Sequence, residues 1–286
     1  MTRTSATMLA RVSGLLALAV ILAGCGGGSK PGAKTEATAG TSDKPQPLKV
    51  TTIEPAGYAK AIVGRVTYTG PEAEAKVVFV PTKLEDKGDC PKEVPGEGWY
   101  VDESSDKKGV RYAVVYVRPA TGYRMPPLEK LERPEKGPEF VELRQPSCQF
   151  EPRVLLLPPD SKLRIWNDSD KGHKPIDHDA NITELQPVQL KPGENRDLDV
   201  PANDREPRTV TCGRHSGFMK AYIWKFSHPY AAVSDKDGQY RIPHVIVPKD
   251  GKLELWVWHE KLGKSKKVQD LTLKADEEIK VDITLP

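Results

Sequence analysis

The sequence lacks the motifs of the common enzyme classes. No Gly-x-Ser-x-Gly nucleophile elbow occurs in its 286 residues. The stretch Gly263-Lys264-Ser265 is not a phosphate-binding P-loop, because Trp258 stands where that motif requires its first glycine. The chain also lacks an excess of one charge, since 43 basic and 40 acidic residues give a formal net charge of +3. This balance does not favour nucleic acid as a partner, and we expect a protein that is not an enzyme.

The N-terminus holds an apolar run, Leu15–Leu22, that is too short to span a membrane comfortably. Arg3 and Arg11 precede this run, and the sequence Leu-Ala-Gly-Cys follows it and ends at Cys25. This order resembles the bacterial lipoprotein signal, in which cleavage precedes a lipidated cysteine. We therefore expect a signal peptide over residues 1–24 and a lipid on Cys25. The alternative is an uncleaved anchor in which the cysteine is incidental.

Residues 25–50 are poor in the large apolar side chains that a folded core requires. They begin with Gly and Ser, continue with Lys and Pro, and reach a large apolar residue only at about Leu48. We expect a flexible tether with a root-mean-square reach of roughly 25 to 30 Å. The predicted location is the cell envelope, with the folded part anchored to a membrane through its lipid and facing the periplasm or the exterior.

The part of the chain after Ala61 has no long helical period. Short β-branched runs alternate instead with Pro, Gly, Asp and Asn, which is typical of an all-β protein. Twelve such runs fit two β-sandwiches better than one. The expected strands are 62–68, 76–80, 111–117, 153–157, 163–166, 197–200, 208–212, 221–226, 239–242, 252–258, 268–273 and 278–284.

Three soft or imidazole side chains lie within eight positions in the last third of the chain. The stretch Thr-Cys-Gly-Arg-His-Ser-Gly-Phe-Met contains the thiol of Cys212, the imidazole of His215 and the thioether of Met219. Two His, one Cys and a weak axial Met are the ligands of type 1 copper, the electron-transfer centre of blue copper proteins. The stretch therefore supplies three of the four ligands of such a site.

The second imidazole must come from another part of the chain. His173 is the first candidate, because it follows the expected strand that ends near Asn167. His178 lies five residues further on and is the alternative first ligand. The other histidines lie in or beside expected strands without a partner at ligand spacing, and we interpret them as structural: His228, His244 and His259.

Two cysteines remain once Cys25 is assigned to the lipid and Cys212 to the metal. An exported protein works where disulfides persist, so we predict a disulfide between Cys90 and Cys148. If Cys212 instead paired with one of them, the copper prediction would fail.

Two parts of the chain resemble known families. Residues Ile62–Gly70 together with Val233–Val257 resemble the carboxypeptidase regulatory-like domain, a transthyretin-like sandwich, in their opening Gly-x-Val strand and their Asp-x-Asp-Gly-x-Tyr turn. Residues Cys148–Met219 resemble the cupredoxins. The combination is similar to exported plastocyanin-like, methylamine-utilisation-type proteins, in which both patterns occur together.

This resemblance implies a domain organisation and a function. The N-terminal part, 51–139, and the C-terminal part, 228–286, would form the transthyretin-like sandwich. A cupredoxin-like Greek-key sandwich, 140–227, would be inserted into it or packed beside it. The resemblance also implies electron transfer to a redox protein partner through one type 1 copper, with these ligands: His173, Cys212, His215 and Met219.

The sequence departs from the cupredoxin pattern at two positions. Lys174 follows the expected first ligand where the family often has Asn, and Arg153 follows the Phe-x-Pro segment where related proteins often have His. The basic residues near the ligands favour an acidic redox partner, which they would attract electrostatically: Lys171, Lys174, Arg214 and Lys220.

A different function is the alternative. The protein would then be a non-redox envelope lipoprotein, in which a degenerate cupredoxin-like domain has lost its metal and the chain binds carbohydrate or another protein. In this hypothesis Trp256 and Trp258 would form an exposed aromatic platform.

Overall fold

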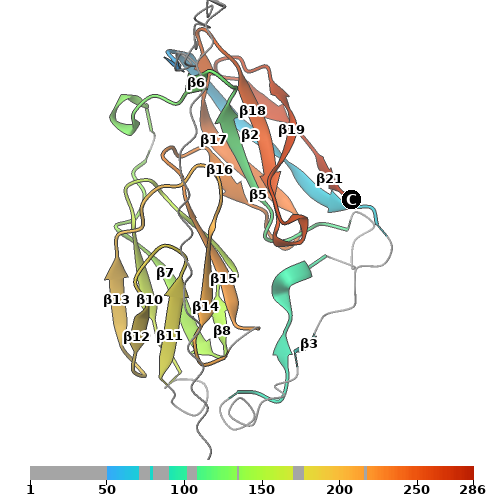
Figure 1. Ribbon diagram of the computed structural model, residues 1–286. Coiled ribbons are helices and arrows are strands. Elements are labelled where there is room, and N and C mark those ends of the chain that lie inside the picture. The colour runs from blue at the N-terminus through green and yellow to red at the C-terminus, as the bar shows by residue number, and fades with distance from the viewer. Residues whose placement is uncertain are drawn as a thin grey trace, which may run out of the picture. The chain divides into compact units, whose positions relative to one another are not determined.

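The structure of the protein is a computed structural model (Figure 1). It describes residues 50–70, 78–79, 90–101, 108–133, 135–169, 177–215 and 218–286. The expected signal peptide, Cys25 with its expected lipid, the expected tether up to residue 49 and His173 lie outside these ranges. None of the helices in the described ranges has the length and apolar character needed to cross a membrane. They are single 3-10 turns, η1 (Glu97–Trp99), η2 (Leu128–Lys130) and η3 (Glu260–Leu262).

The described chain is all-β, as the sequence pattern predicted, and its middle part forms two facing sheets. Their strands pair only with one another among the described residues, and we call this pair of sheets the middle sandwich. One sheet has the order β13 (Asn195–Leu198), β10 (Lys162–Trp166), β7 (Phe140–Ser147) and β8 (Gln149–Glu151). The other has the order β12 (Val188–Leu190), β11 (His178–Ile182), β14 (Arg208–Cys212), β15 (Lys220–Lys225) and β9 (Val154–Leu157).

Strands from both ends of the described chain form a second pair of sheets, the end sandwich (Figure 1). One sheet has the order β16 (Ala231–Val233), β5 (Val114–Pro119), β18 (Leu253–Trp258) and β19 (Lys266–Leu271). The other has β17 (Gln239–Pro248), β2 (Pro55–Tyr68) and β20 (Glu278–Lys280), with β21 (Ile283–Leu285) also on β2. Two short two-stranded sheets are also present, β1 (Thr51–Thr52) with β6 (Tyr123–Arg124) and β3 (Val78–Phe79) with β4 (Val94–Pro95).

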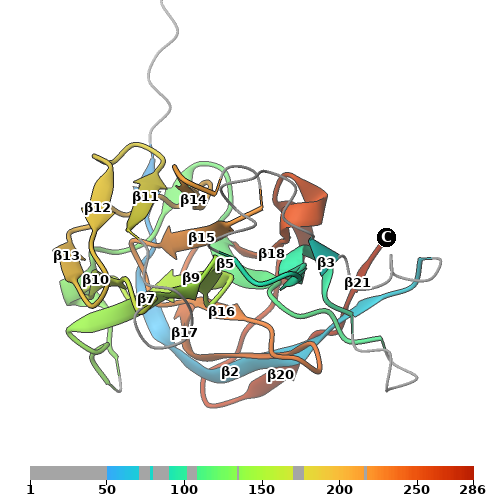
Figure 2. The same ribbon diagram turned by 90° about the horizontal axis from the view of Figure 1, so that it is seen from below.

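Each sandwich has its own apolar core, and a third cluster joins the two. Alternation along β5 explains this arrangement, because Val115 and Val117 enter the core of the end sandwich while Val114 and Tyr116 face the other way. A strand that is buried on both faces reads as a continuous apolar run, and Val-Val-Tyr-Val is such a run. The central strands β5, β9, β15 and β16 lie close together in Figure 2. The joining group, named here the interface cluster, is Tyr112, Val114, Tyr116, Val154, Trp224, Phe226 and Trp258.

Several strands were not predicted from the sequence, and they include β7, β11, β12 and β16. The strand β11 reads His-Asp-Ala-Asn-Ile, which has only one β-branched residue, yet its residues alternate between the core and the outside. In contrast, β17 continues through Pro243, although the predicted strand ended at Ile242. This proline is tolerated because β17 lies at an edge and, among the described strands, pairs only with β2.

Buried His259 should make the protein less stable in acid. Burial lowers its pKa from 6.5 to about 4, so the unfolded chain binds this proton more readily than the folded chain does. The contribution of neutral His259 to the free energy of unfolding is fully present above pH 6.5 and is lost as the pH falls towards 4. The loss amounts to about 2 kcal/mol between about pH 7 and about pH 5. Urea unfolding at both pH values should show this loss. His259→Gln should reduce the difference by the same amount, and an unchanged pH dependence in that variant would contradict the assignment.

Candidate metal site

Two neighbouring strands bring a histidine and a cysteine together inside the middle sandwich. His178 is the first residue of β11 and Cys212 is the last residue of β14. The antiparallel register pairs Ala180 with Cys212. Because residues two apart share a face of a strand, His178, Ala180 and Cys212 all point to the buried side of the sheet, and all three are buried.

The segment between β14 and β15 supplies the other two candidate ligands. The backbone N–H of Cys212 donates a hydrogen bond to the carbonyl oxygen of Met219 at 3.3 Å, which continues the ladder between the two strands. Met219 is buried in the core of the middle sandwich beside Cys212. His215 lies in the intervening loop and is also buried. The predicted Cys-x-x-His-x-x-x-Met stretch therefore places its members on one inner region of the sandwich.

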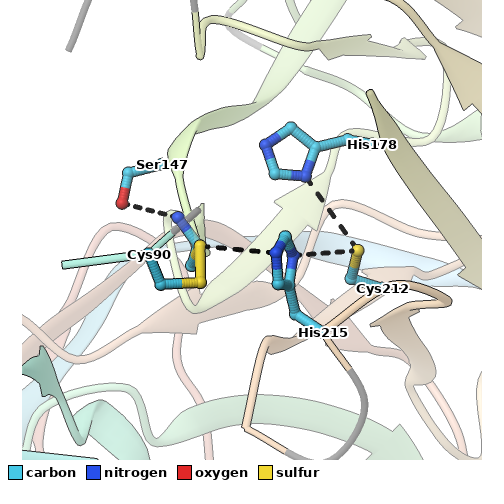
Figure 3. Close-up of a disulfide and its surroundings, with 6 residues drawn as sticks. Cys90, Ser147, His178, Cys212 and His215 are labelled. Carbon is cyan, nitrogen blue, oxygen red and sulfur yellow. Dashed lines mark hydrogen bonds between the residues drawn. A yellow bond between two sulfur atoms is a disulfide. The ribbon is translucent and has the colours of Figure 1, made fainter. Parts of the chain in front are cut away.

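The two histidines present the same kind of nitrogen to the cysteine. The Nδ1 atom of His215 lies 3.5 Å from the Sγ atom of Cys212, and the Nδ1 atom of His178 lies 4.0 Å from it (Figure 3). The three donor atoms lie within 4.8 Å of one another. Donor atoms that bind one ion at the sulfur and nitrogen distances typical of proteins lie about 3.6 Å apart. The observed separations therefore fit a shared metal ion.

The protonation state of His178 suits a ligand. Burial first, and then electrostatic interactions with His215 and Arg214, lower its pKa from 6.5 to about 4. The imidazole is therefore neutral near pH 7, and only neutral imidazole has a lone pair to bind a metal. Its Nε2 atom is buried without a hydrogen-bond partner among the described residues. A 4.0 Å contact with a thiol is a weak reason to bury an imidazole, whereas a metal bond at Nδ1 would be a sufficient one.

The structure brings together some of the predicted site residues but does not describe all of them. Cys212, His215 and the alternative ligand His178 form one buried group, while the first candidate, His173, lies outside the described residues. Cys90 and Cys148 form a disulfide, so Cys212 stays a free thiol. Cys212 is therefore not paired with Cys90 or Cys148, a pairing that would have excluded a copper site.

A second contact of His215 was not foreseen from the sequence. Its Nε2 atom lies 3.6 Å from the Sγ atom of Cys148, so the imidazole stands between the free thiol and the disulfide (Figure 3). These two sulfur groups are 64 residues apart in the sequence, and no local motif joins them. Only the folding of β8 and β14 into facing sheets brings them to one ring.

Arg153 stands outside this group. It precedes β9 and donates one hydrogen bond to the carbonyl oxygen of Lys220 at 2.7 Å. It also forms an ion pair with Glu260 of η3, with 2.8 Å between the nearest nitrogen and oxygen. Arg153 therefore ties the middle sandwich to the end sandwich.

The aromatic platform of the alternative hypothesis is not present. Trp258 belongs to the interface cluster and is 4% exposed, so it cannot stack on a ligand in solution. One side of the half-buried Trp256 is occupied by the guanidinium of Arg118, which lies 4.7 Å from the ring centre. Its indole N–H donates to Glu254. The expectation was wrong because it placed both residues on a solvated surface. The face of β18 that carries them packs against the interface cluster instead.

Comparison with known proteins adds no assignment. No protein-family model matches the chain, and no match to a curated protein was found. Function has to be inferred from the chemistry of the site itself.

Proposed function

We propose that the protein is a lipid-anchored electron carrier of the bacterial envelope that binds one type 1 copper. The residues that would hold the metal are Cys212, His178 and His215, with the thioether of Met219 as a further, weaker donor. The observation that supports this best is the approach of two Nδ1 atoms to one buried, free thiol at 3.5 and 4.0 Å. Bound copper would supply the one-electron step by cycling between Cu(I) and Cu(II).

The residues of the chain have distinct tasks in this proposal. Cys212 provides a thiolate, which is the ligand form of cysteine. Strands β11 and β14 fix the thiolate and His178 relative to each other through their backbone ladder. Burial of all three donor residues keeps water out, and a site held by paired strands changes little in shape during electron transfer. The chain therefore supplies rigidity and desolvation.

Zinc is the main competitor for a site with one thiolate and two imidazoles. A thioether is a soft donor and favours copper over zinc. Met219 is buried beside Cys212, where such a donor is needed. The composition of the site therefore favours copper.

The proposed fold assignment goes with this function. The middle sandwich would be a cupredoxin-like domain, and the end sandwich a transthyretin-like one. The separate strand pairing of the two sandwiches supports the assignment, because strands from both ends of the described chain form one pair of sheets while β7 to β15 form the other.

The proposed partner is an acidic redox protein that approaches the exposed side of the ligand loop. The Arg214 side chain is 49% exposed, and it forms a weak surface pair with Asp177 at 4.0 Å. Lys220 lies over the ring of Tyr222. Lys171 and Lys174 lie outside the described residues. The positive charge beside the ligands would steer an acidic surface towards them.

An absorption spectrum tests the proposed function. Full-length protein in detergent, loaded with Cu(II), should show an intense visible band from thiolate-to-copper charge transfer. Cys212→Ser should remove this band, because an alcohol does not replace the thiolate ligand. The matched variant Cys25→Ser should keep it. A colourless wild-type protein that binds zinc, or that binds no metal, would overturn the proposal and favour a non-redox envelope protein.

A further inference from the structure

His215 makes a polar contact at each end of its imidazole ring. Nδ1 faces the thiol of Cys212 at 3.5 Å, and Nε2 faces the disulfide sulfur of Cys148 at 3.6 Å (Figure 3). Both cysteines and the histidine are buried, with exposed fractions of 0% for Cys148 and 2% for His215 and Cys212. The ring is therefore held between two sulfur atoms of different chemistry.

The two sulfur atoms are not equivalent hydrogen-bonding groups. A thiol has one weak donor and one weak acceptor, whereas a disulfide sulfur has no hydrogen and can only accept. A neutral imidazole carries its single proton on one nitrogen. With the proton on Nε2, the ring donates to Cys148 and its Nδ1 lone pair accepts from the Cys212 thiol. With the proton on Nδ1, the lone pair of Nε2 would face the lone pairs of the disulfide.

We propose that the Cys90–Cys148 disulfide is a positioning group for the metal site. It selects the tautomer of His215 that has its proton on Nε2 and thereby leaves the Nδ1 lone pair directed at Cys212. Metal-binding histidines usually donate their other N–H to a carboxylate or a carbonyl, which fixes the ring. Here the disulfide sulfur takes that place. The part of this proposal that concerns copper rests on the proposed function.

Packing around the disulfide supports a fixed ring orientation. Cys148 is buried with Val94, Cys90 and Phe218 in a small apolar cluster of its own. The ring of Phe218 also contacts that of His215, with 6.1 Å between their centres. The imidazole is thus limited by an aromatic ring as well as by its two sulfur contacts. The disulfide links the segment that leads into β4 to the turn between β7 and β8, next to His215.

The tautomer can be measured in metal-free full-length protein by nitrogen NMR of the histidine side chains. In the wild type, His215 should carry its proton on Nε2. In the double variant Cys90→Ala/Cys148→Ala, it should become a mixture of both tautomers. Competition titration should show that the variant binds Cu(II) about 10- to 100-fold more weakly, the usual effect of losing the partner of a metal-binding histidine. A wild-type His215 with its proton on Nδ1 would overturn the proposal, whatever the variants do.

Two further variants separate positioning from stability. Val94→Ala removes apolar contacts from the same small cluster but leaves the disulfide and its contact with His215 in place. It should lower the thermal midpoint and leave the tautomer and the copper affinity unchanged. Cys90→Ala/Cys148→Ser puts a hydroxyl acceptor beside Nε2 and should restore part of the affinity that the alanine pair loses. If Val94→Ala weakens copper binding as much as the alanine pair does, the disulfide has only a structural role.

The two proposals fail in different ways. If wild-type His215 has the Nε2 proton but the protein binds no copper, the proposed function fails and the positioning role in the metal-free protein stands. If the wild type binds copper and the alanine pair changes neither tautomer nor affinity, the positioning role fails and the proposed function stands.

Discussion

Replacing Arg153 with methionine should lower the free energy of unfolding by about 2 kcal/mol, because its partly buried ion pair lies between an exposed pair, worth up to about 1 kcal/mol, and a fully buried one, whose breaking costs about 3 to 5 kcal/mol. The exposed fractions of the two side chains are 16% for Arg153 and 11% for Glu260. The variant leaves the partly buried Glu260 carboxylate without its cation and leaves the carbonyl oxygen of Lys220 without its donor. Urea unfolding monitored by tryptophan fluorescence measures the change.

The double variant Arg153→Met/Glu260→Leu distinguishes the cost of an uncompensated charge from the value of the pair. It removes both charges, so it should be clearly more stable than Arg153→Met alone. The difference between the double variant and the sum of the single variants gives the coupling between the two residues. Equal losses in Arg153→Met and in the double variant would show that the ion pair does not determine the stability of this contact.

The fold class followed from the sequence because alternation and turn residues act locally. The run Gln239–Ile242 after the turn at Asp237 is read correctly from its neighbours alone, and the strand is present. The strand β11 was missed because its outward residues are Asp and Asn and its inward residues are His, Ala and Ile. Such a segment becomes a strand through pairing with β12, which follows it closely in sequence, and with β14, which lies further along the chain. Tertiary pairing therefore overrides a weak local propensity.

The candidate site could likewise be predicted only in part from local sequence. Cys212, His215 and Met219 are close in sequence, and their spacing alone indicated a metal site. The choice between His173 and His178 could not be made locally, since both follow the same strand within a few residues. The alternation of His178, Ala180 and Ile182 was the signal that could have identified a strand with His178 on its inner face. The contact between His215 and the disulfide depends on facing sheets, and nothing in the spacing of the residues indicates it.

His178→Gln should therefore remove the first imidazole ligand, whereas His173→Gln should leave the site intact. Nδ1 of His178 lies 4.0 Å from the Cys212 Sγ atom, and the pKa of about 4 keeps the ring neutral and able to bind. Loss of a direct ligand should weaken Cu(II) binding by more than about 100-fold, beyond the range seen for residues that only support a ligand. The visible band should disappear with it.

The two glutamine variants are matched controls for each other, because each removes one imidazole from the same stretch of chain and keeps a polar side chain. Cu(II) competition titration and the charge-transfer band, measured side by side on both variants, decide between the two histidines. Loss of the band in His173→Gln with normal binding in His178→Gln would assign the ligand to His173. It would then follow that the contact between His178 and Cys212 is a feature of the buried core, and that the segment holding His173 reaches the thiolate when copper binds.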